Sequence, residues 1–130
     1  MPLSFPSRGR VLAVDDSSVI REILIASLEA AGYSVEAVAT GHAALAAASR
    51  ESFDAVILDV DMPGMDGLEL GRALRKDPRT RASRIAMHTS MDESVVRSIF
   101  DGYDVFLPKP CEARLLGECI DRLVAQPRPL

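Results

Sequence analysis

Long hydrophobic runs are missing from this sequence. Segments such as Ala55 to Leu58 are far shorter than the roughly 18 residues that a membrane-spanning helix needs. The N-terminus also lacks the basic start and apolar stretch of a secretory signal. We therefore expect a cytoplasmic protein that makes no use of a membrane.

Cysteine is scarce. Cys111 and Cys119 are the two present, and they lie eight residues apart in a stretch with helical periodicity. That spacing separates them by about 12 Å at ~1.5 Å rise per residue, too far for a disulfide. We expect two reduced core thiols, with a reactive or metal-binding role as the alternative.

An excess of positive charge is also missing. Lysine and arginine number 15 against 19 aspartates and glutamates, giving a formal net charge of −4 and a pI near 5.1. This balance argues against nucleic acid as a main partner, because phosphate binding needs a basic face. One local basic run, which suits a helix C-terminus and its solvated loop, comprises Arg72, Arg75, Lys76, Arg79, Arg81 and Arg84.

What is present indicates one domain. A length of 130 residues matches a single core, and the sequence shows no repeat or low-complexity tract. Proline and small residues mark two terminal extensions, residues 1–9 and 126–130, which leaves residues 10–125 as the domain. We expect no second domain to follow.

Short apolar runs alternate with amphipathic stretches along the chain. The strand candidates are Val11 to Val14, Ser34 to Val38, Ala55 to Leu58, Ile85 to Met87 and Asp104 to Leu107. This rhythm predicts an α/β fold, a doubly wound five-stranded parallel sheet with five helices. In the flavodoxin-like strand order 2-1-3-4-5, the first and third strands are neighbours.

The sequence predicts where the intervening helices begin and which of their faces are apolar. Thr40 and Asp92 occupy N-cap positions, Asp66 with Glu69 resembles a capping box, and Gly32 ends the first helix. Apolar faces are predicted at Val19, Ile20, Ile23, Leu24 and Leu28 in the first helix, and at Leu115, Leu116, Cys119, Ile120, Leu123 and Val124 in the last.

Polar residues follow the predicted strands. Asp15 and Asp16 end the first strand, Asp59 the third, Thr89 the fourth and Lys109 the fifth. The carboxyl ends of parallel strands open on one edge of the sheet, so these side chains should converge there. Clustered carboxylates either become partly neutral or bind a cation, and an all-oxygen set suits Mg²⁺. Lys109 adds a positive group, and such a pocket can neutralise a transferring phosphoryl group.

Taken in order, these motifs resemble the receiver domains of bacterial two-component response regulators, of which the chemotaxis regulator is a single-domain member. The resemblance spans about Arg10 to Val124. It is carried by Val-Asp15-Asp16, Leu-Asp59-Val-Asp-Met-Pro63-Gly-Met-Asp-Gly67, Thr89-Ser90 and Lys109-Pro110.

The resemblance implies a role for each matching residue. Asp59 would accept the phosphoryl group, and Asp15, Asp16, Asp59 and the backbone carbonyl of Asp61 would hold Mg²⁺. Lys109 would contact the phosphoryl oxygens, with a cis peptide before Pro110. Thr89 and Phe106 would form a switch pair that carries the change to a surface of the fourth helix, fifth strand and fifth helix. Val96, Arg97 and Phe100 are the candidate contacts there.

The resemblance also implies partners. A histidine kinase or histidine phosphotransfer protein would supply the phosphoryl group, and a downstream protein would read the switch surface. The protein would be a phosphoacceptor rather than an enzyme, either a monomer or a phosphorylation-dependent homodimer.

Two departures from the family pattern stand out. Ser90 replaces a usual Ala or Gly, and Pro108 precedes Lys109, where an edge strand tolerates the missing N–H. Asp61 and Met91 match positions that tune loss of the phosphoryl group.

Each of these residues, taken singly, also has a purely structural interpretation. Asp16 could cap the first helix, Asp59 and Asp61 could belong to a turn, and Thr89 and Phe106 could be ordinary strand residues. His42 and His88 are interpreted as structural or solvent-facing, since neither has a second ligand at metal spacing.

Two other functions remain open from the residues. Asp59-Val-Asp61 after an apolar strand imitates a haloacid-dehalogenase-like phosphohydrolase, although Pro63 and the Asp15-Asp16 pair do not fit that pattern. Turnover of an aryl phosphate, abolished by Asp61→Asn, would identify that activity. The fold could alternatively serve as a scaffold that is never phosphorylated.

Overall fold

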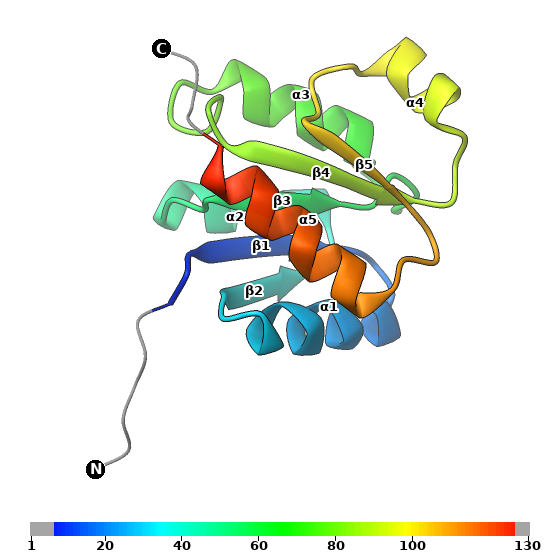
Figure 1. The fold of residues 1–130 in the computed structure, drawn as a ribbon. Helices are drawn as coiled ribbons and strands as arrows, with labels where there is room; N and C mark the ends of the chain where they lie inside the picture. Colours follow the sequence, from blue (N-terminus) through cyan, green and yellow to red (C-terminus); the bar gives the residue numbers. More distant parts are fainter. Residues whose placement is uncertain (1–6, 127–130) are drawn as a thin grey trace.

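A computed structural model describes residues 7–126, so most of both predicted terminal extensions, residues 1–6 and 127–130, lies outside the described residues. Strands and helices alternate along the chain (Figure 1). The elements are β1 (Arg10–Val14), α1 (Ser18–Ala30), β2 (Ser34–Val38), α2 (Gly41–Arg50), β3 (Ala55–Leu58), α3 (Gly67–Lys76), β4 (Arg84–Thr89), α4 (Glu93–Ile99), β5 (Val105–Pro108) and α5 (Ala113–Ala125).

The sheet has the predicted topology. Its five strands are all parallel and lie in the order β2-β1-β3-β4-β5. The boundaries of β4 and β5 differ from the prediction: β4 runs on through Thr89, and β5 is displaced by one residue toward Pro108. Pro108 is exposed on this edge strand, and the chain resumes pairing when the Lys109 N–H donates to the Thr89 carbonyl at 2.9 Å.

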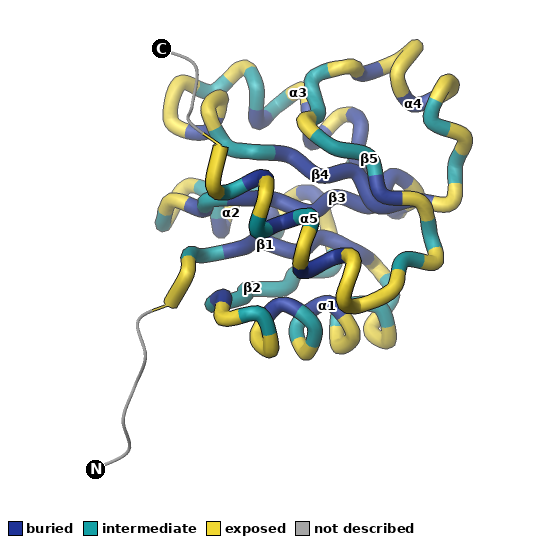
Figure 2. The backbone as a smooth tube through the Cα atoms, in the orientation of Figure 1, coloured by how far each residue is buried: buried dark blue, intermediate teal, exposed yellow. Residues whose placement is uncertain are grey.

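Helices cover both faces of the sheet, and β1, β3 and β4 form its buried centre (Figure 2). Successive strand residues point to opposite faces, so Leu12 joins one apolar cluster and Val11 the other. The cluster that contains Leu12 includes side chains of α2, α3 and α4. The cluster that contains Val11 includes side chains of α1 and α5. The sheet therefore separates two aliphatic layers.

The predicted apolar faces of α1 and α5 were wrong at three positions. Val19, Ile23 and Leu115 are 63%, 48% and 47% exposed, whereas Leu24 and Leu116 are buried. Helical spacing marks a broad apolar stripe, but the sheet and the neighbouring helix cover only part of it. Ile23 lines a cavity between α1 and α5, where its side chain stays partly open.

Most of the residues predicted to begin or end a helix are confirmed. Thr40, Asp66 and Asp92 are N-caps whose side chains accept backbone hydrogen bonds. Ser17, not Asp16, caps α1, because its side chain accepts from the Ile20 N–H. Gly32 follows the end of α1 with φ +101°, a conformation that favours glycine.

The two cysteines are free, as expected, but Cys111 precedes α5 instead of lying in it. Both are partly buried beside the apolar layer of α1 and α5.

No helix within residues 7–126 combines the length and apolar character required to cross a bilayer.

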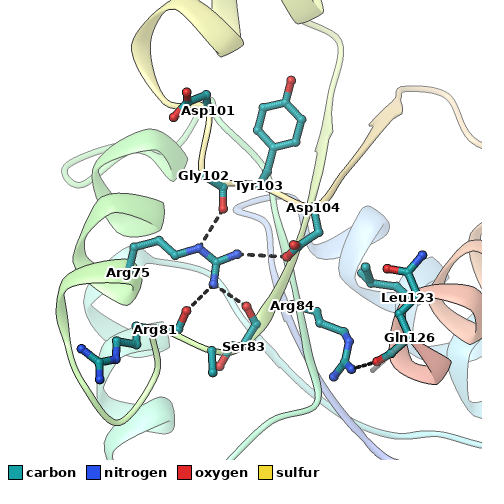
Figure 3. Close-up of a pocket in the computed structure, with 11 residues that line it drawn as sticks. Arg75, Arg81, Ser83, Arg84, Asp101, Gly102, Tyr103, Asp104, Leu123 and Gln126 are labelled. Atoms are coloured by element: carbon teal, nitrogen blue, oxygen red, sulfur yellow. Dashed lines mark hydrogen bonds and ion pairs between the residues drawn. The ribbon is translucent and has the colours of Figure 1, made fainter. Parts of the chain in front are cut away.

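The basic run is not wholly a solvated face. Arg75 donates to the carbonyls of Gly102, Arg81 and Ser83 and pairs with Asp104 at 2.9 Å (Figure 3). It joins the end of α3 to the loops that flank β4 and β5. This partly buried guanidinium therefore has a structural role, because its donors are used by backbone carbonyls and one carboxylate.

We expect Gly67→Ala to destabilise the protein. A Cβ at Gly67 would lie 1.9 Å from the Asp59 carbonyl oxygen, so the start of α3 or the end of β3 must move. Overpacking of this kind costs about 2–3 kcal/mol, measurable as a lower urea midpoint.

Gly117→Ala is the matched control within α5. Its Cβ would meet only the Ala31 Cβ at 3.4 Å, so the gain in helix propensity of up to about 1 kcal/mol should appear. Equal urea midpoints for Gly67→Ala and the unmodified protein would contradict the close approach of α3 to Asp59.

Candidate functional site

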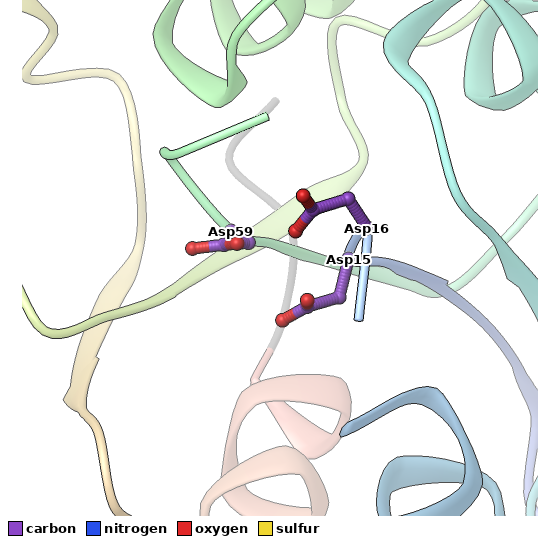
Figure 4. A group of neighbouring side chains, drawn as sticks. All are labelled: Asp15, Asp16 and Asp59. Carbon is purple, nitrogen blue, oxygen red and sulfur yellow. The ribbon is translucent and has the colours of Figure 1, made fainter. Parts of the chain in front are cut away.

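The carboxyl edge of the sheet brings three aspartates together. Asp15 and Asp16 follow β1, and Asp59 follows the neighbouring β3 (Figure 4). One carboxylate oxygen from each lies within 4.8 Å of the others. Asp15 and Asp59 are buried and Asp16 is exposed. The parallel register predicted this convergence, and the structure confirms it.

Lys109 reaches the same cluster from the end of β5. Its Nζ lies 2.8 Å from the Asp15 Oδ2 and 3.4 Å from the Asp59 Oδ1. Burial lowers the pKa of Lys109, but the hydrogen bond to Asp15 and the attraction of both carboxylates outweigh it and raise the pKa. The ammonium group therefore stays charged between two buried acids.

Asp15 is held in place from several sides. Its side chain is 1% exposed. One carboxylate oxygen accepts from the Ser17 N–H at 2.9 Å and the other from Lys109. The Arg21 guanidinium donates to its carbonyl. These contacts fix Asp15 at the start of α1 and orient its carboxylate toward the edge of the sheet.

The surroundings of Asp59 disfavour the charged form of its carboxylate. Burial raises its pKa, and the Asp15 carboxylate raises it further, while Lys109 and the Val60 N–H lower it in part. The net pKa of Asp59 is raised. The pocket thus carries more negative charge than Lys109 alone neutralises.

The acidic cluster fits a divalent cation. The excess negative charge is uncompensated, and every donor is a carboxylate oxygen, which is the ligand type that Mg²⁺ prefers. Within residues 7–126, this trio is the one group of acidic, histidine or cysteine side chains that meets the geometry of a metal site. Asp61 is exposed nearby, and the predicted role of its carbonyl stays a prediction.

Thr89 ends β4, the strand beside β3, and Phe106 lies in the next strand, β5. Thr89 is fully buried, and its Oγ1 accepts from the Met91 N–H at 3.1 Å. Phe106 is partly buried against the apolar layer of α2, α3 and α4, with its ring 6.1 Å from that of Tyr103. The Thr89 hydroxyl makes no hydrogen bond to the aspartates in this conformation, so its proton is available to another acceptor.

Two of the three predicted surface contacts were wrong. Val96 and Phe100 are 0% and 6% exposed, because both pack into the core beneath α4. Arg97 is exposed as predicted. The exposed apolar side chains on α4 are instead Val95 and Ile99, at 45% and 50%.

Sequence reasoning missed a polar link from α4 to this region. The Tyr103 hydroxyl donates to Glu93 at 2.9 Å, and Arg97 donates to both of these side chains. Since the Tyr103 ring also contacts Phe106, the link joins α4 to the start of β5. A tyrosine two residues before a strand gives no local sequence signal for such a contact.

The two histidines differ in how far they are exposed to solvent. His42 is exposed, whereas His88 is 5% exposed on β4. Burial and, secondarily, Lys109 lower the pKa of His88 to about 4. Its ring is therefore neutral near pH 7.

The site and fold have clear relatives. A family model described as "Response regulator receiver domain" matches residues 11–121. The response regulator PleD of Caulobacter vibrioides is 38% identical over 110 residues, covering 83% of this chain and 24% of the relative. MprA of Mycobacterium leprae is 38% identical over 120 residues, covering 92% and 53%. This chain thus spans between a quarter and about half of these relatives.

Solved structures are also similar to this chain. Chemotaxis response regulator CheY4 of Vibrio cholerae has a TM-score of 0.82 and 36% identity, with 88% of this chain and 97% of that chain covered. The receiver domain of sensor histidine kinase PA1611 from Pseudomonas aeruginosa has a TM-score of 0.84 and 28% identity, covering 91% and 98%. That structure has a magnesium ion coordinated in its active site cleft.

We expect Asp59→Asn to stabilise the protein in the absence of divalent cations. A raised folded-state pKa means that the charged carboxylate opposes folding at neutral pH, and the stability of the unmodified protein rises as pH falls through that pKa. The thermal midpoint of the variant should be a few degrees higher at neutral pH, with the difference shrinking on acidification.

Asp61→Asn is the matched control, because this neighbouring carboxylate is exposed. Its effect should stay within about 0.5 kcal/mol. A lower midpoint for Asp59→Asn at neutral pH would contradict the repulsion between Asp15 and Asp59.

Proposed function

Because the chain belongs to the response regulator receiver domain family, we propose that it is a phosphorylation switch whose phosphoacceptor is Asp59. The observation that carries the proposal is the burial of Asp59 between two further aspartates and Lys109. The phosphoryl donor would be a histidine kinase or a histidine phosphotransfer protein. We take residues 10–125 as the receiver domain.

The acidic cluster would hold Mg²⁺. Asp15, Asp16, Asp59 and the Asp61 carbonyl are the proposed protein ligands, with Asp15 acting largely through water. The ion would supply positive charge for the phosphoryl oxygens. The magnesium seen in the PA1611 receiver domain supports this assignment.

The remaining chemistry belongs to side chains of this chain. A carboxylate oxygen of Asp59 would form the bond to phosphorus while the bond from phosphorus to the donor's leaving group breaks. Lys109 lies 3.4 Å from Asp59 Oδ1 and would neutralise a phosphoryl oxygen. Burial of Asp59 limits access of water to the acyl phosphate that results.

The switch would use the free hydroxyl proton of Thr89. A phosphoryl group adds about −1.5 to −2 charges and three acceptors, so Thr89 gains a charge-assisted hydrogen bond only after phosphorylation. Phe106 would turn inward behind it. Moving a switch from about 1:99 to 99:1 takes roughly 5.5 kcal/mol, so several new contacts must act together.

The output surface would comprise α4, β5 and α5. The proposed contacts on α4 are Arg97, Val95 and Ile99, which are exposed and replace the buried Val96 and Phe100 of the sequence-based set. Tyr103 contacts both Phe106 and Glu93, which supports a path from the switch pair to α4. A downstream protein or a second phosphorylated copy would bind there.

The alternatives are less favoured. The family match and the burial of the Asp15 carboxylate beside Asp59 support a receiver over a haloacid-dehalogenase-like hydrolase. The intact acidic and lysine positions argue against an unphosphorylated scaffold. We propose a phosphoacceptor protein in the cytoplasm that does not use nucleic acid or a membrane as partner.

Phosphorylation can be tested with acetyl phosphate and Mg²⁺, read by intact mass. We expect the mass of one phosphoryl group on the full chain and its loss when EDTA removes the metal. Asp59→Asn should abolish the modification. Asp15 is the other buried acid beside Lys109, but its two carboxylate oxygens already accept hydrogen bonds from the Ser17 N–H and from Lys109.

The control is Asp61→Asn, which removes a neighbouring carboxylate and should leave the modification in place. Undiminished labelling of the Asp59→Asn protein would refute Asp59 as the phosphoacceptor.

The route from Thr89 to α4 can be tested by hydrogen exchange, which requires no known partner. Phosphorylation should change amide protection in Glu93–Ile99 of the unmodified protein. In Phe106→Ala that change should be lost although the mass still shows one phosphoryl group. Leu115→Ala, on the exposed face of α5, serves as the control that keeps the response. A full response in Phe106→Ala would remove Phe106 from the route.

A further inference from the structure

Asp16 differs from the other two aspartates of the acidic cluster in having no contact that holds its side chain. The Asp15 carboxylate accepts hydrogen bonds from Lys109 and the Ser17 N–H. Asp59 pairs with the same lysine. The exposed carboxylate of Asp16 makes no hydrogen bond or ion pair within residues 7–126. Its place beside the other two acids is therefore decided by the backbone between Asp15 and Ser17 (Figure 4).

Two hydrogen bonds fix that stretch of backbone. The Ser17 N–H donates to Asp15 Oδ1 at 2.9 Å, which closes a turn around Asp16. From one turn further along α1, the Arg21 Nη1 donates to the Asp15 carbonyl oxygen, also at 2.9 Å. The donor of the first bond is a main-chain group, whereas the donor of the second is a side chain. Arg21 is therefore the position at which a substitution can release this backbone.

The acceptor that Arg21 uses indicates its role. Its partly buried guanidinium group lies next to a cluster with surplus negative charge, yet it makes no ion pair with a carboxylate in the described part of the chain. A guanidinium group that served to neutralise the acids would pair with one of them, because its contacts with carboxylates are its strongest hydrogen bonds. Arg21 donates instead to the carbonyl of the peptide that joins Asp15 to Asp16, and so sets the direction of that peptide.

We propose that Arg21 is a positioning residue for the divalent cation: by holding the Asp15 carbonyl, it directs the Asp16 carboxylate toward the ion. This inference rests on the proposed magnesium site and deepens it. Removing a group that orients metal ligands without being one typically weakens metal binding by about 10–100-fold. Loss of the Arg21 contact should therefore weaken Mg²⁺ binding, although Arg21 is not a ligand.

The sign of the effect separates this role from simple electrostatics. Arg21 is a cation, so removing its charge alone would make the site more negative and tighten Mg²⁺ binding. Removing its hydrogen bond frees the peptide before Asp16 and weakens Mg²⁺ binding. The two effects oppose each other, and only the positioning role predicts a net loss of affinity.

The test measures the Mg²⁺ dissociation constant of the unphosphorylated full chain from amide chemical shifts in a titration. Arg21→Met keeps an unbranched stem and a good helix former but loses the donors and the charge. We expect Mg²⁺ binding by this variant to be about ten-fold weaker. Arg21→Lys retains a donor and should bind Mg²⁺ more tightly than Arg21→Met, whereas its retained charge alone would make it bind more weakly.

Two controls separate positioning from a general loss of charge or stability. Arg122→Met removes an exposed arginine in the last turn of α5 and should leave the Mg²⁺ affinity unchanged. Ile120→Val shortens a buried side chain of the same helix, so it should lower the thermal midpoint without weakening Mg²⁺ binding.

An affinity of Arg21→Met equal to or higher than that of the unmodified protein, measured well below the thermal midpoint, would overturn the role of Arg21 alone. Absence of Mg²⁺ binding by the unmodified protein would overturn the proposed metal site as well, so the two failures are distinguishable. Neither result depends on whether Asp59 accepts a phosphoryl group.

Discussion

The ammonium group of Lys109, held between Asp15 and Asp59, is the interaction on which the site depends. It lies 2.8 Å from one carboxylate and 3.4 Å from the other, and both acids are buried. One positive charge cannot neutralise two buried acids and the exposed Asp16 beside them. The resting site therefore has a surplus of negative charge, and the raised pKa of Asp59 reflects it.

This surplus connects stability with function. A bound divalent cation would stabilise the folded state by relieving repulsion between the aspartates, and any ligand that binds only the folded protein adds stability by mass action. A phosphoryl group at the same place would add charge again, so nearby hydrogen-bond donors gain new partners only in the modified state. Thr89 at the end of β4 is such a donor, because its Oγ1 accepts a hydrogen bond from the Met91 N–H and its hydroxyl proton remains for another acceptor.

Close packing around Asp59 makes the site sensitive to small shifts. The Asp59 carbonyl leaves room for only a hydrogen at position 67, where α3 begins. Lys109 pairs with Asp15 and Asp59 and also lines a cavity between α1 and α5.

Much of the architecture could be read from the sequence. Alternating apolar runs and amphipathic stretches determine an α/β sheet, and polar residues after parallel strands must meet at one edge. The capping residues Thr40, Asp66 and Asp92 were equally readable, because capping depends on the side chain and backbone within one turn. Asp15, Asp59 and Lys109 were predicted for the same reason: their positions follow from strand ends.

What the sequence could not determine depends on contacts between distant segments. Periodicity marked Val19, Ile23 and Leu115 as core, and only the packing of α1 against α5 decided that they stay exposed. The link from Tyr103 to α4, the structural role of Arg75 and the burial of His88 likewise have no local signal. Local patterns determine which elements form and which way they face, whereas tertiary packing alone decides how much of each face is covered and which polar atoms find partners.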